Sequence, residues 1–584
     1  MMFEEEREKP SSNEEAEHLP EPPLPLPKLI WQVLYRRGFH SADAIKELYS
    51  PKLNTLSDPN QLKGMKRSTE RLIQALVQNE RVCLYADFDL DGTPGLALLK
   101  QGLEWMGFSN LEHYQPKRLS EGYGLHAHAL KDFAERGVSL VVTVDVGITA
   151  IEEVELANEL GIDVIITDHH QPKEALPNAH AIVNPNQPDC QSEMGYLCGA
   201  GVAYYLVLAL RRELKNRKLL EEDFNPKHLL DCFAIATITD MVPLVNENRV
   251  LVKHGLLQLE NTTRPGLRSL LDAVDLSGRR ISSQDIGFRF APKLNALSRM
   301  ERGLLPIDLF LANTRELAES YVSEVLQNNE ERVALQKKAE QESIEKTGAS
   351  IDHGFVWVYS ENFHKGVVGL VATKMAQKYG VPAFIGSVNT NGDIVGSARL
   401  PNSKGSVLEA LEHGKEFLSG FGGHAPAAGF HLSLATAESF AEKLRDFFKT
   451  VDWSKMDPGD SESVPYEGVG FVEDLHGSFM SWYEGLGPFG IGFETPKFKV
   501  DQVVVKGFKW LSGGHLKLTL ESRMQKARVD GLWFSPPKNH PIQGNHLEVG
   551  AHVHVVGEPQ WNYFAGRKTL QLLLDDVVFV EHGV

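Results

Sequence analysis

Short apolar runs alternate with amphipathic helical stretches between residue 28 and about residue 305 of this 584-residue chain. RVCLYA precedes GLALLKQGLEWMG, LVVTV precedes ITAIEEVELANELG, and DVIIT precedes a loop. A continuous apolar strand is typical of a parallel sheet that helices cover on both faces. The alternation therefore predicts βαβ units around a parallel sheet, and with them an α/β fold.

The remainder of the chain divides into four segments of different character. Residues 1–27 are rich in Glu, Pro and Ser and predict a disordered tail. Residues 306–349 predict a long connecting helix, and residues 350–455 predict a second α/β lobe with a hairpin at NTNGDIVGSARLP. Residues 460–584 predict a small antiparallel β-barrel or sandwich, because Gly, Pro and Asn turns separate short β-rich runs.

The composition excludes several classes of protein. Four cysteines without a Cys-x-x-Cys pair exclude a disulfide scaffold and indicate reduced thiols in a cytosolic protein. No apolar run approaches the roughly 18 residues of a membrane helix, and the acidic start with Glu4 and Glu5 is unlike a signal peptide. The formal net charge of −18 argues against nucleic-acid binding driven by total charge, although a local basic channel is compatible with it.

Acidic and histidine side chains follow three of the predicted strands. They are Asp87, Asp89 and Asp91 after the first strand, Asp145 after the second, and Asp168, His169 and His170 after the third. Side chains just beyond the carboxyl ends of parallel strands meet in one crevice. Each Asp taken singly is most often a helix N-cap or a turn residue. The set as a whole, at successive strand ends, instead favours five carboxylates and two imidazoles around a metal.

Carboxylates at this density raise one another's pKa unless a cation neutralises them. Carboxylate and imidazole without thiolate favour Mn²⁺ or Mg²⁺ over a structural zinc. So many anionic ligands could hold two ions, and two ions about 4 Å apart support phosphoryl chemistry. Asp240 is a further candidate because it follows the apolar run CFAIATIT, where a carboxylate is costly unless it is paired or metal-bound. Helix capping or a pair with an Arg is the alternative for Asp240.

Taken together, DFDLDG, VDVGI and the DHH triplet resemble the DHH phosphoesterase superfamily. Further fragments follow in the order found in its bacterial single-stranded-DNA exonucleases: PKRLSEGYGL, CGAGVAYYL, ITDMVPLVNENR, PKLNALSRM, GVVGLVATKMAQKYGVP, GSARLP and GGHAPAAGF. The resemblance spans residues 80 to about 430, and it covers the final β-rich region by architecture only.

This resemblance implies a DHH catalytic lobe at residues 28–305, a DHH-associated substrate-binding lobe at 350–455 and an OB-like single-strand-binding domain at 460–584. It implies a cytoplasmic, monomeric hydrolase of single-stranded DNA that uses two Mn²⁺ or Mg²⁺ ions in DNA repair or recombination. Nucleoside 5′-monophosphates would be released in the 5′ to 3′ direction. A single-strand-binding protein and a helicase are the protein partners that the resemblance suggests, and no membrane is involved.

Carried over position by position, the resemblance implies these metal ligands: Asp87, Asp89, Asp91, Asp145, His169, His170 and Asp240. The catalytic residues among them would be Asp89, Asp91, Asp145, His169 and His170, and Asp168 would orient a histidine. The substrate-binding candidates are Arg118, Asn295, Arg299, Ser397, Arg399, Gly422, Gly423 and His424. Arg binds phosphate through two parallel hydrogen bonds, and Gly leaves backbone amides uncovered. An ordinary Gly-Gly turn and a pair between Arg299 and an acid are the alternatives.

Three positions depart from the family pattern. Val146 stands where the family usually has Asn, Thr93-Pro94-Gly95 replaces small residues, and Leu297-Ser298 replaces Ala-Gly. Val146 supplies no amide hydrogen bond that could support Asp145. None of the implied metal ligands is lost, so activity is expected.

Cations and aromatic residues interleave in the terminal β-rich region, as they do in strand-binding barrels. They are Lys506, Lys509, Trp510, Lys517, Lys526, Arg528, Trp533, Trp561, Tyr563, Phe564, Arg567 and Lys568. A place in the barrel core is equally compatible with Trp533 and Trp561. Two other functions stay open: a hydrolase of short RNA or nucleotide second messengers, and an inactive replication scaffold. Chain length and the β-rich domain argue against the first, and the retained acidic and histidine positions argue against the second.

Overall fold

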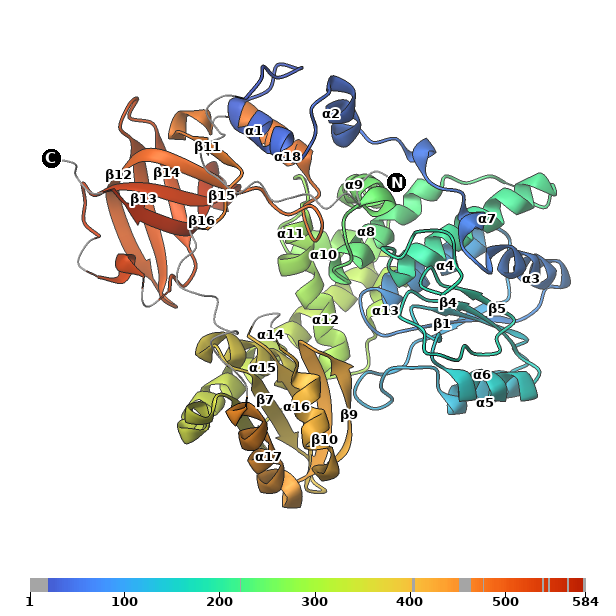
Figure 1. The fold of residues 1–584 in the computed structure, drawn as a ribbon. Helices are drawn as coiled ribbons and strands as arrows, with labels where there is room; N and C mark the ends of the chain where they lie inside the picture. Colours follow the sequence, from blue (N-terminus) through green and yellow to red (C-terminus); the bar gives the residue numbers. More distant parts are fainter. Residues whose placement is uncertain are drawn as a thin grey trace. The chain divides into compact units, whose positions relative to one another are not determined.

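The computed structural model describes residues 19–580, apart from 221, 402–404, 451–463, 476, 538–539, 545–546 and 565–566 (Figure 1). They form two compact units, one of Ser57–Pro458 and one that joins Met1–Leu56 to Gly459–Val584. Residues 1–18, most of the expected tail, lie outside the described residues, and so does the side chain of Phe564.

The larger unit begins with a five-stranded parallel sheet in the order β2-β1-β3-β4-β5. The strands are β1 (Val82–Ala86), β2 (Leu111–Tyr114), β3 (Leu140–Val144), β4 (Asp163–Thr167) and β5 (Ala181–Val183). Helices α5 (Ala127–Glu135) and α6 (Ile151–Glu159) cover one face, and α3 (Met65–Gln78), α4 (Gly92–Trp105) and α7 (Gly199–Asn216) cover the other (Figure 1). Every residue of β1 and β3 is buried, which explains their apolar runs and confirms the predicted βαβ fold.

A helical region follows the sheet and includes the expected long helix. Its elements are α8 (Leu230–Thr239), α9 (Asn246–Glu260), α10 (Pro265–Ala273), α11 (Ser283–Asp285), a π-helical turn (Ile286–Phe290), α12 (Ala291–Met300), α13 (Pro306–Leu311) and α14 (Arg315–Lys346). The long helix α14 begins at Arg315 and not at 306, because α13 is a separate helix. The Thr314 side chain accepts a hydrogen bond from Leu317 N and so caps the new helix.

The second lobe of this unit is a mixed sheet in the order β6-β7-β8-β10-β9. Its strands are β6 (Val356–Ser360), β7 (Ala383–Val388), β8 (Asp393–Arg399), β9 (Leu418–His424) and β10 (Ala427–Ser433). Helix α15 (Val368–Tyr379) packs on one face together with α14, and α16 (Val407–His413) and α17 (Ala437–Lys449) pack on the other. The antiparallel pairing of β7 with β8 is the hairpin that NTNGDIVGSARLP predicts.

The smaller unit is built on a β-barrel. Its strands are β11 (Gly468–Gly470), β12 (Phe498–Leu511), β13 (His515–Ser522), β14 (Arg528–Trp533), β15 (His552–Phe564) and β16 (Arg567–Phe579). They follow the order β11-β12-β13-β14-β16-β15, and β12 also pairs with β15. This last pairing closes five strands into the expected barrel.

The expected start of the first lobe at residue 28 is wrong. Helices α1 (Lys28–Arg36) and α2 (Ala42–Tyr49) belong to the smaller unit, where Leu29 and Leu34 share a buried core with Phe479 of α18 (Gly477–Leu486). Residues 19–27 of the expected tail also contact this core, since Trp31 Nε1 donates to the Pro20 carbonyl at 2.7 Å. The apolar face of an amphipathic helix does not by itself specify which core will cover it.

Within the described residues, no helix combines the length and apolar character needed to cross a membrane. All four cysteines are free thiols, as predicted, and Cys83, Cys198 and Cys232 are buried.

Candidate metal centre

The carboxyl ends of β1, β3 and β4 bring acidic and imidazole side chains together. The strand order reverses between β1 and β3, which is where open α/β sheets bind ligands. Asp87 N donates to Val144 O at 3.2 Å, and Asp145 N donates to Thr167 O at 2.9 Å. Asp87 and Asp145 therefore continue the hydrogen bonding of the sheet one residue beyond the ends of β1 and β3.

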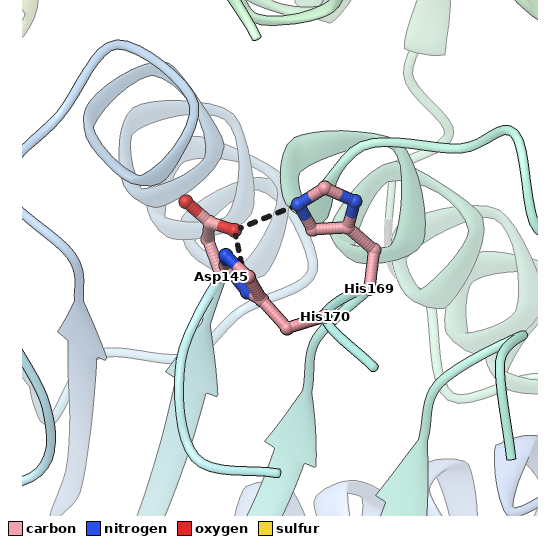
Figure 2. A group of neighbouring side chains, drawn as sticks. All are labelled: Asp145, His169 and His170. Atoms are coloured by element: carbon pink, nitrogen blue, oxygen red, sulfur yellow. Dashed lines mark ion pairs between the residues drawn. The ribbon is translucent and has the colours of Figure 1, made fainter. Parts of the chain in front are cut away.

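The seven expected metal ligands lie in three overlapping groups, each with potential ligand atoms within 4.8 Å of one another. The groups are Asp87, Asp89 and Asp145; Asp91, His169 and Asp240; and Asp145, His169 and His170. Figure 2 shows Asp145 facing both imidazoles, with its Oδ1 3.3 Å from His169 Nε2 and 3.7 Å from His170 Nδ1. Because Asp145 belongs to two groups, it is the carboxylate that two ion positions would share.

The alternatives for individual acids can be compared with the structure. Asp89 Oδ1 accepts hydrogen bonds from Asp91 N at 2.8 Å and Gly92 N at 3.0 Å, so one of its oxygens does cap a turn. Asp240 follows the last residue of α8, and its Oδ2 lies 3.6 Å from His169 Nε2. No Arg among the described residues pairs with Asp240. Its carboxylate therefore faces the other candidate ligands.

Four buried ligand atoms at this centre have no hydrogen-bond partner among the described residues: Asp87 Oδ1, Asp145 Oδ1, His169 Nε2 and Asp240 Oδ2. Buried polar atoms in folded proteins are nearly always paired, so a converging unpaired set requires a partner of another kind. Carboxylate oxygens and imidazole nitrogens without thiolate suit Mn²⁺ or Mg²⁺. The donor set therefore fits divalent cations.

The electrostatics of the centre favour the same conclusion. Burial, followed by repulsion from neighbouring carboxylates, raises the pKa of the Asp145 carboxyl. Burial and the charge of Asp89 likewise raise the pKa of Asp87. The pKa of Asp240 rises to about 9 through burial and the charges of Asp91 and Asp89. A bound cation would remove this penalty by neutralising the carboxylates.

We expect the metal-free protein to lose stability as the pH rises from 6 to 9. Raised carboxyl pKa values mean that the folded state holds these protons more tightly than the unfolded chain. Their stabilisation is complete below the ordinary pKa of about 4 and is lost as the pH rises through the folded-state values, which reach about 9 for Asp240. Mn²⁺ at about 100 times its dissociation constant should restore about 2.7 kcal/mol. Thermal melts after chelation, with and without Mn²⁺, check this, and the same pH dependence in both series would contradict it.

Asp168 lies behind the two histidines. It accepts hydrogen bonds from Ile148 N at 2.9 Å and His169 N at 2.7 Å, and its Oδ1 lies 2.8 Å from His170 Nδ1. Burial opposes ionisation of Asp168, but the hydrogen bond and charge of His170 lower its pKa overall. Burial likewise opposes protonation of His170, yet the same pair raises its pKa to about 9. These contacts fix the His170 ring, as an orienting carboxylate would.

Two asparagines that the sequence analysis did not identify hold the histidine backbone. Asn184 Nδ2 donates to His170 O at 2.9 Å, and Asn186 Nδ2 donates to His169 O at 2.5 Å. Both residues follow β5, the next strand of the sheet. The sequence signal that could have identified them was the presence of polar residues at the end of a fourth strand.

Two departures from the family pattern have local explanations. Val146 is buried in the apolar core with Val154, so its side chain packs under α6 and not at the centre. Thr93 Oγ1 accepts a hydrogen bond from Gln115 Nε2 at 2.7 Å, and Gln115 Nε2 also donates to Asp87 O at 2.7 Å. Gln115 thereby ties the end of β2 to the first acidic loop.

The first turn of α7 holds Asp91, one of the expected metal ligands. Gly199 N and Ala200 N donate to the two oxygens of Asp91 at 2.6 and 2.8 Å, as expected for a carboxylate at a helix N-terminus. A Cβ at position 199 would lie 2.5 Å from the Cβ of Asp145. Only glycine allows this close approach.

Gly199→Ala should weaken Mn²⁺ binding by about 10- to 100-fold, the usual effect of disturbing a residue that supports a metal ligand. The added methyl would displace Asp145 or the start of α7. Gly201→Ala on the same helix is the matched control, because its Cβ would meet its nearest neighbours at 3.3 Å. Titration calorimetry measures both affinities, and equal affinities would contradict the assignment.

Three of the substrate-binding candidates form an arginine cluster, defined here as Arg118, Arg299 and Arg399. Burial, with the charges of Arg118, Arg332 and Arg399, lowers the pKa of Arg299 to about 9. Within the described part of the chain, none of the three pairs with a carboxylate, which removes the acid-pair alternative for Arg299. Asn295 lies one helical turn before Arg299 on α12. The cluster is therefore a half-buried positive site that no described carboxylate compensates.

The pairing of β8, β10 and β9 places other substrate-binding candidates on the same face of the sheet as Arg399. Ser397 pairs with Gly429 and Gly429 with Gly422, while Arg399 pairs with Ala427 and Ala427 with His424. Residues aligned across adjacent strands share a face of the sheet, so Ser397, Arg399, Gly422 and His424 lie on one face. Gly423 lies between the last two with a φ of 141°. A Cβ on Gly369, at the start of α15, would lie 3.1 Å from Arg399 Nη2 and 3.3 Å from Ser397 Oγ.

The barrel candidates differ in their surroundings. Three cations form ion pairs within the barrel: Lys506 and Arg528 with Glu521, and Lys517 with Asp530. Trp533 is 5% exposed and packs in the core, as the alternative interpretation held. Trp510 and Tyr563 are 39% and 45% exposed, so bases could stack on them. Lys568 Nζ lies 4.2 Å from the ring centroid of Trp561.

The chain matches three known domain families. Residues 81–237 match the DHH family, N-terminal domain; residues 352–452 match the DHHA1 domain; and residues 468–576 match the RecJ OB domain. The single-stranded-DNA-specific exonuclease RecJ of Bacillus subtilis (strain 168) is 32% identical over 96% of this chain and 69% of its own length. The RecJ of Salmonella typhimurium is 30% identical, with 96% of this chain and 98% of the relative covered.

Solved structures give a consistent result. The crystal structure of RecJ in complex with Mn²⁺ from Thermus thermophilus is 26% identical, has a TM-score of 0.76, and covers 94% of this chain and 76% of that chain. A crystal structure of exonuclease RecJ bound to manganese is 31% identical, has a TM-score of 0.58, and covers 67% of this chain and 96% of that chain.

Proposed function

Because this chain belongs to the RecJ family of single-stranded-DNA-specific exonucleases, we propose that it removes nucleoside 5′-monophosphates one at a time from the 5′ end of single-stranded DNA. It is a single-stranded-DNA exonuclease that uses a divalent metal, Mn²⁺ or Mg²⁺. The observation that carries the finer proposal is the convergence of acidic and imidazole groups in the same unit as an uncompensated arginine cluster.

The proposed ligands of two ions are Asp87, Asp89, Asp91, Asp145, His169, His170 and Asp240. Ions bound there would activate a water for attack on phosphorus and neutralise charge on the leaving oxygen. Asp145 would serve both ion positions, and the backbone amides of Gly199 and Ala200 hold Asp91 in place. Asp168 holds the His170 ring through Nδ1, so Nε2 is the nitrogen that would bind a metal. Hydrogen bonds within the protein thus hold Asp89, Asp91 and His170 before substrate arrives.

The arginine cluster and Ser397 bind the 5′-terminal phosphate in this proposal. Guanidinium groups hold phosphate through paired hydrogen bonds, and partial burial strengthens those bonds. With the terminal phosphate held there, the next phosphodiester along the strand meets the metal centre. This arrangement accounts for the 5′ to 3′ direction and for mononucleotide products.

Glu301 is a positioning residue for Arg118. It ends α12 with a φ of 50°, where Gly is normally favoured. Its Oε1 accepts hydrogen bonds from Leu119 N at 3.3 Å, Ser120 N at 3.2 Å and Ser120 Oγ at 2.8 Å. Lys365 Nζ donates to Leu119 O at 2.8 Å and holds the same loop from the second lobe. Glu301 thereby links the Arg118 loop to the helix that carries Arg299.

Glu301→Gly should raise KM for single-stranded DNA by about 10-fold, because losing about 1.4 kcal/mol of positioning weakens binding tenfold. Stability should change little, since Gly adopts positive φ without strain and this gain offsets the loss of the hydrogen bonds of Glu301. Asn79→Gly is the matched control, because Asn79 ends α3 with a φ of 51°. Steady-state kinetics and thermal melts test the pair, and an unchanged KM with a lowered melting temperature would indicate a purely structural role.

A digestion time course on long oligonucleotides labelled at the 5′ or the 3′ end tests the proposed function. With Mn²⁺, the 5′ label should appear at once as a mononucleotide while the 3′-labelled strand shortens progressively. Duplex DNA should stay intact, and chelation should stop both reactions. Cleavage confined to dinucleotides or short RNA would favour the other hydrolase function instead.

We propose further that the enzyme acts as a cytoplasmic monomer in DNA repair or recombination. A helicase would expose the single strand, and a single-strand-binding protein would hold it. Family membership and the reduced thiols support this part of the proposal. Light scattering of the purified protein tests the monomer, which predicts the mass of one chain, 65.0 kDa.

A further inference from the structure

Arg332 of α14 carries a charge that no described residue compensates. Its Nη1 donates to Gln336 Oε1 at 3.0 Å and its Nη2 to Asn329 Oδ1 at 2.7 Å, and both acceptors are neutral amides. Its Nε is buried, and no acceptor in the described part of the chain pairs with it. No carboxylate among the described residues pairs with it. Leaving a half-buried guanidinium without an anion is costly, so the arrangement favours binding of a negative ligand.

The neighbours of Arg332 are also cations. Helix α12 packs along α14 and carries Lys293 and Arg299. Lys293 is half-buried and forms no ion pair with another described residue. Burial, then the charges of Arg332 and Arg289, lowers the pKa of Lys293, and Arg332 contributes in the same sense at Arg299. Arg332, Lys293 and Arg299 together are called the cationic track here. It is a local exception in a chain whose formal net charge is −18.

We propose that Arg332 and Lys293 form a second anion subsite beside the arginine cluster, and that it binds a further backbone phosphate of the same single-stranded DNA. The inference rests on the proposed function. Lys293 and Arg299 are six residues apart on α12, which is about 9 Å along a helix. That spacing lets Lys293 and Arg299 each hold a separate phosphate of the strand.

The substitutions Arg332→Gln and Lys293→Gln test the subsite, with Arg315→Gln as the matched control. Arg315 lies on the same helix and is exposed, and its Nε pairs with Glu319 Oε1 at 2.7 Å. Binding of a fluorescent oligonucleotide is measured across a salt series in an Asp145→Asn background, which prevents cleavage. Steady-state kinetics are measured with Asp145 intact.

Arg332→Gln and Lys293→Gln should each reduce the slope of log affinity against log salt by about 0.7, the value for one phosphate contact on a single strand. KM should rise about 10-fold with kcat unchanged, while Arg332→Lys keeps the charge and the slope. The control should match the parent protein. If both variants had the same salt slope and the same KM as the parent protein, the proposed subsite would be overturned. Absence of single-stranded-DNA hydrolysis by the unaltered enzyme would instead overturn the proposed function.

Discussion

Asp145→Asn is expected to lower kcat on single-stranded DNA by at least about 10³-fold, which corresponds to about 4 kcal/mol of transition-state stabilisation. Asp145 Oδ1 lies between the two imidazoles and belongs to two of the three candidate ligand groups. Losing its charge should therefore disturb both ion positions at once. An amide is a poorer ligand for Mn²⁺ than a carboxylate, and its NH₂ group would face other candidate ligands.

The Asp145→Asn protein should nevertheless fold. Asn tolerates the positive φ of 62° at this position, and the substitution removes a buried carboxylate whose pKa is raised by burial and by its neighbours. Asp132→Asn is the control: Asp132 pairs with Arg136 on the exposed side of α5 and should leave kcat unchanged. Circular dichroism and steady-state kinetics measure both variants. Near-normal turnover by Asp145→Asn would show that Asp145 is not a ligand of the metal centre.

Arg299→Ala is expected to lower kcat/KM by about 100-fold, mainly through KM, because it removes a charged, paired contact worth about 2–3 kcal/mol. Arg299→Lys should recover only part of this loss, since an ammonium keeps the charge but not the two parallel donors. Arg302→Gln is the control, because Arg302 pairs with Glu331 instead of facing the cluster. A KM unchanged in Arg299→Ala would place the terminal phosphate elsewhere.

The architecture could be predicted largely from residue patterning. Continuous apolar runs such as VCLYA and LVVTV occur where strands are buried on both faces, and Gly and Pro turns separate the barrel strands. These local signals depend on nearest neighbours along the chain. The membership of α1 and α2 in the barrel unit could not be predicted, because it depends on contacts between residues more than 400 positions apart, such as Arg36 Nη1 with Tyr466 O.

The candidate centre was predictable for the same reason that the sheet was. Once β1, β3 and β4 are parallel neighbours, the residues that follow them must meet at one edge. The supporting contacts of Gln115 and Glu301 could not be anticipated, because each side chain reaches a backbone group in another loop. Polar residues in loops have many possible partners, and only the fold selects one.

Anomalous diffraction at the manganese edge, from crystals of this protein grown with Mn²⁺, tests the central claim most directly. The account predicts two peaks among the side chains of Asp87, Asp89, Asp91, Asp145, His169, His170 and Asp240, with Asp145 in contact with both. Crystals grown with Mn²⁺ that show no peak among these groups, or a peak at another site alone, would contradict it.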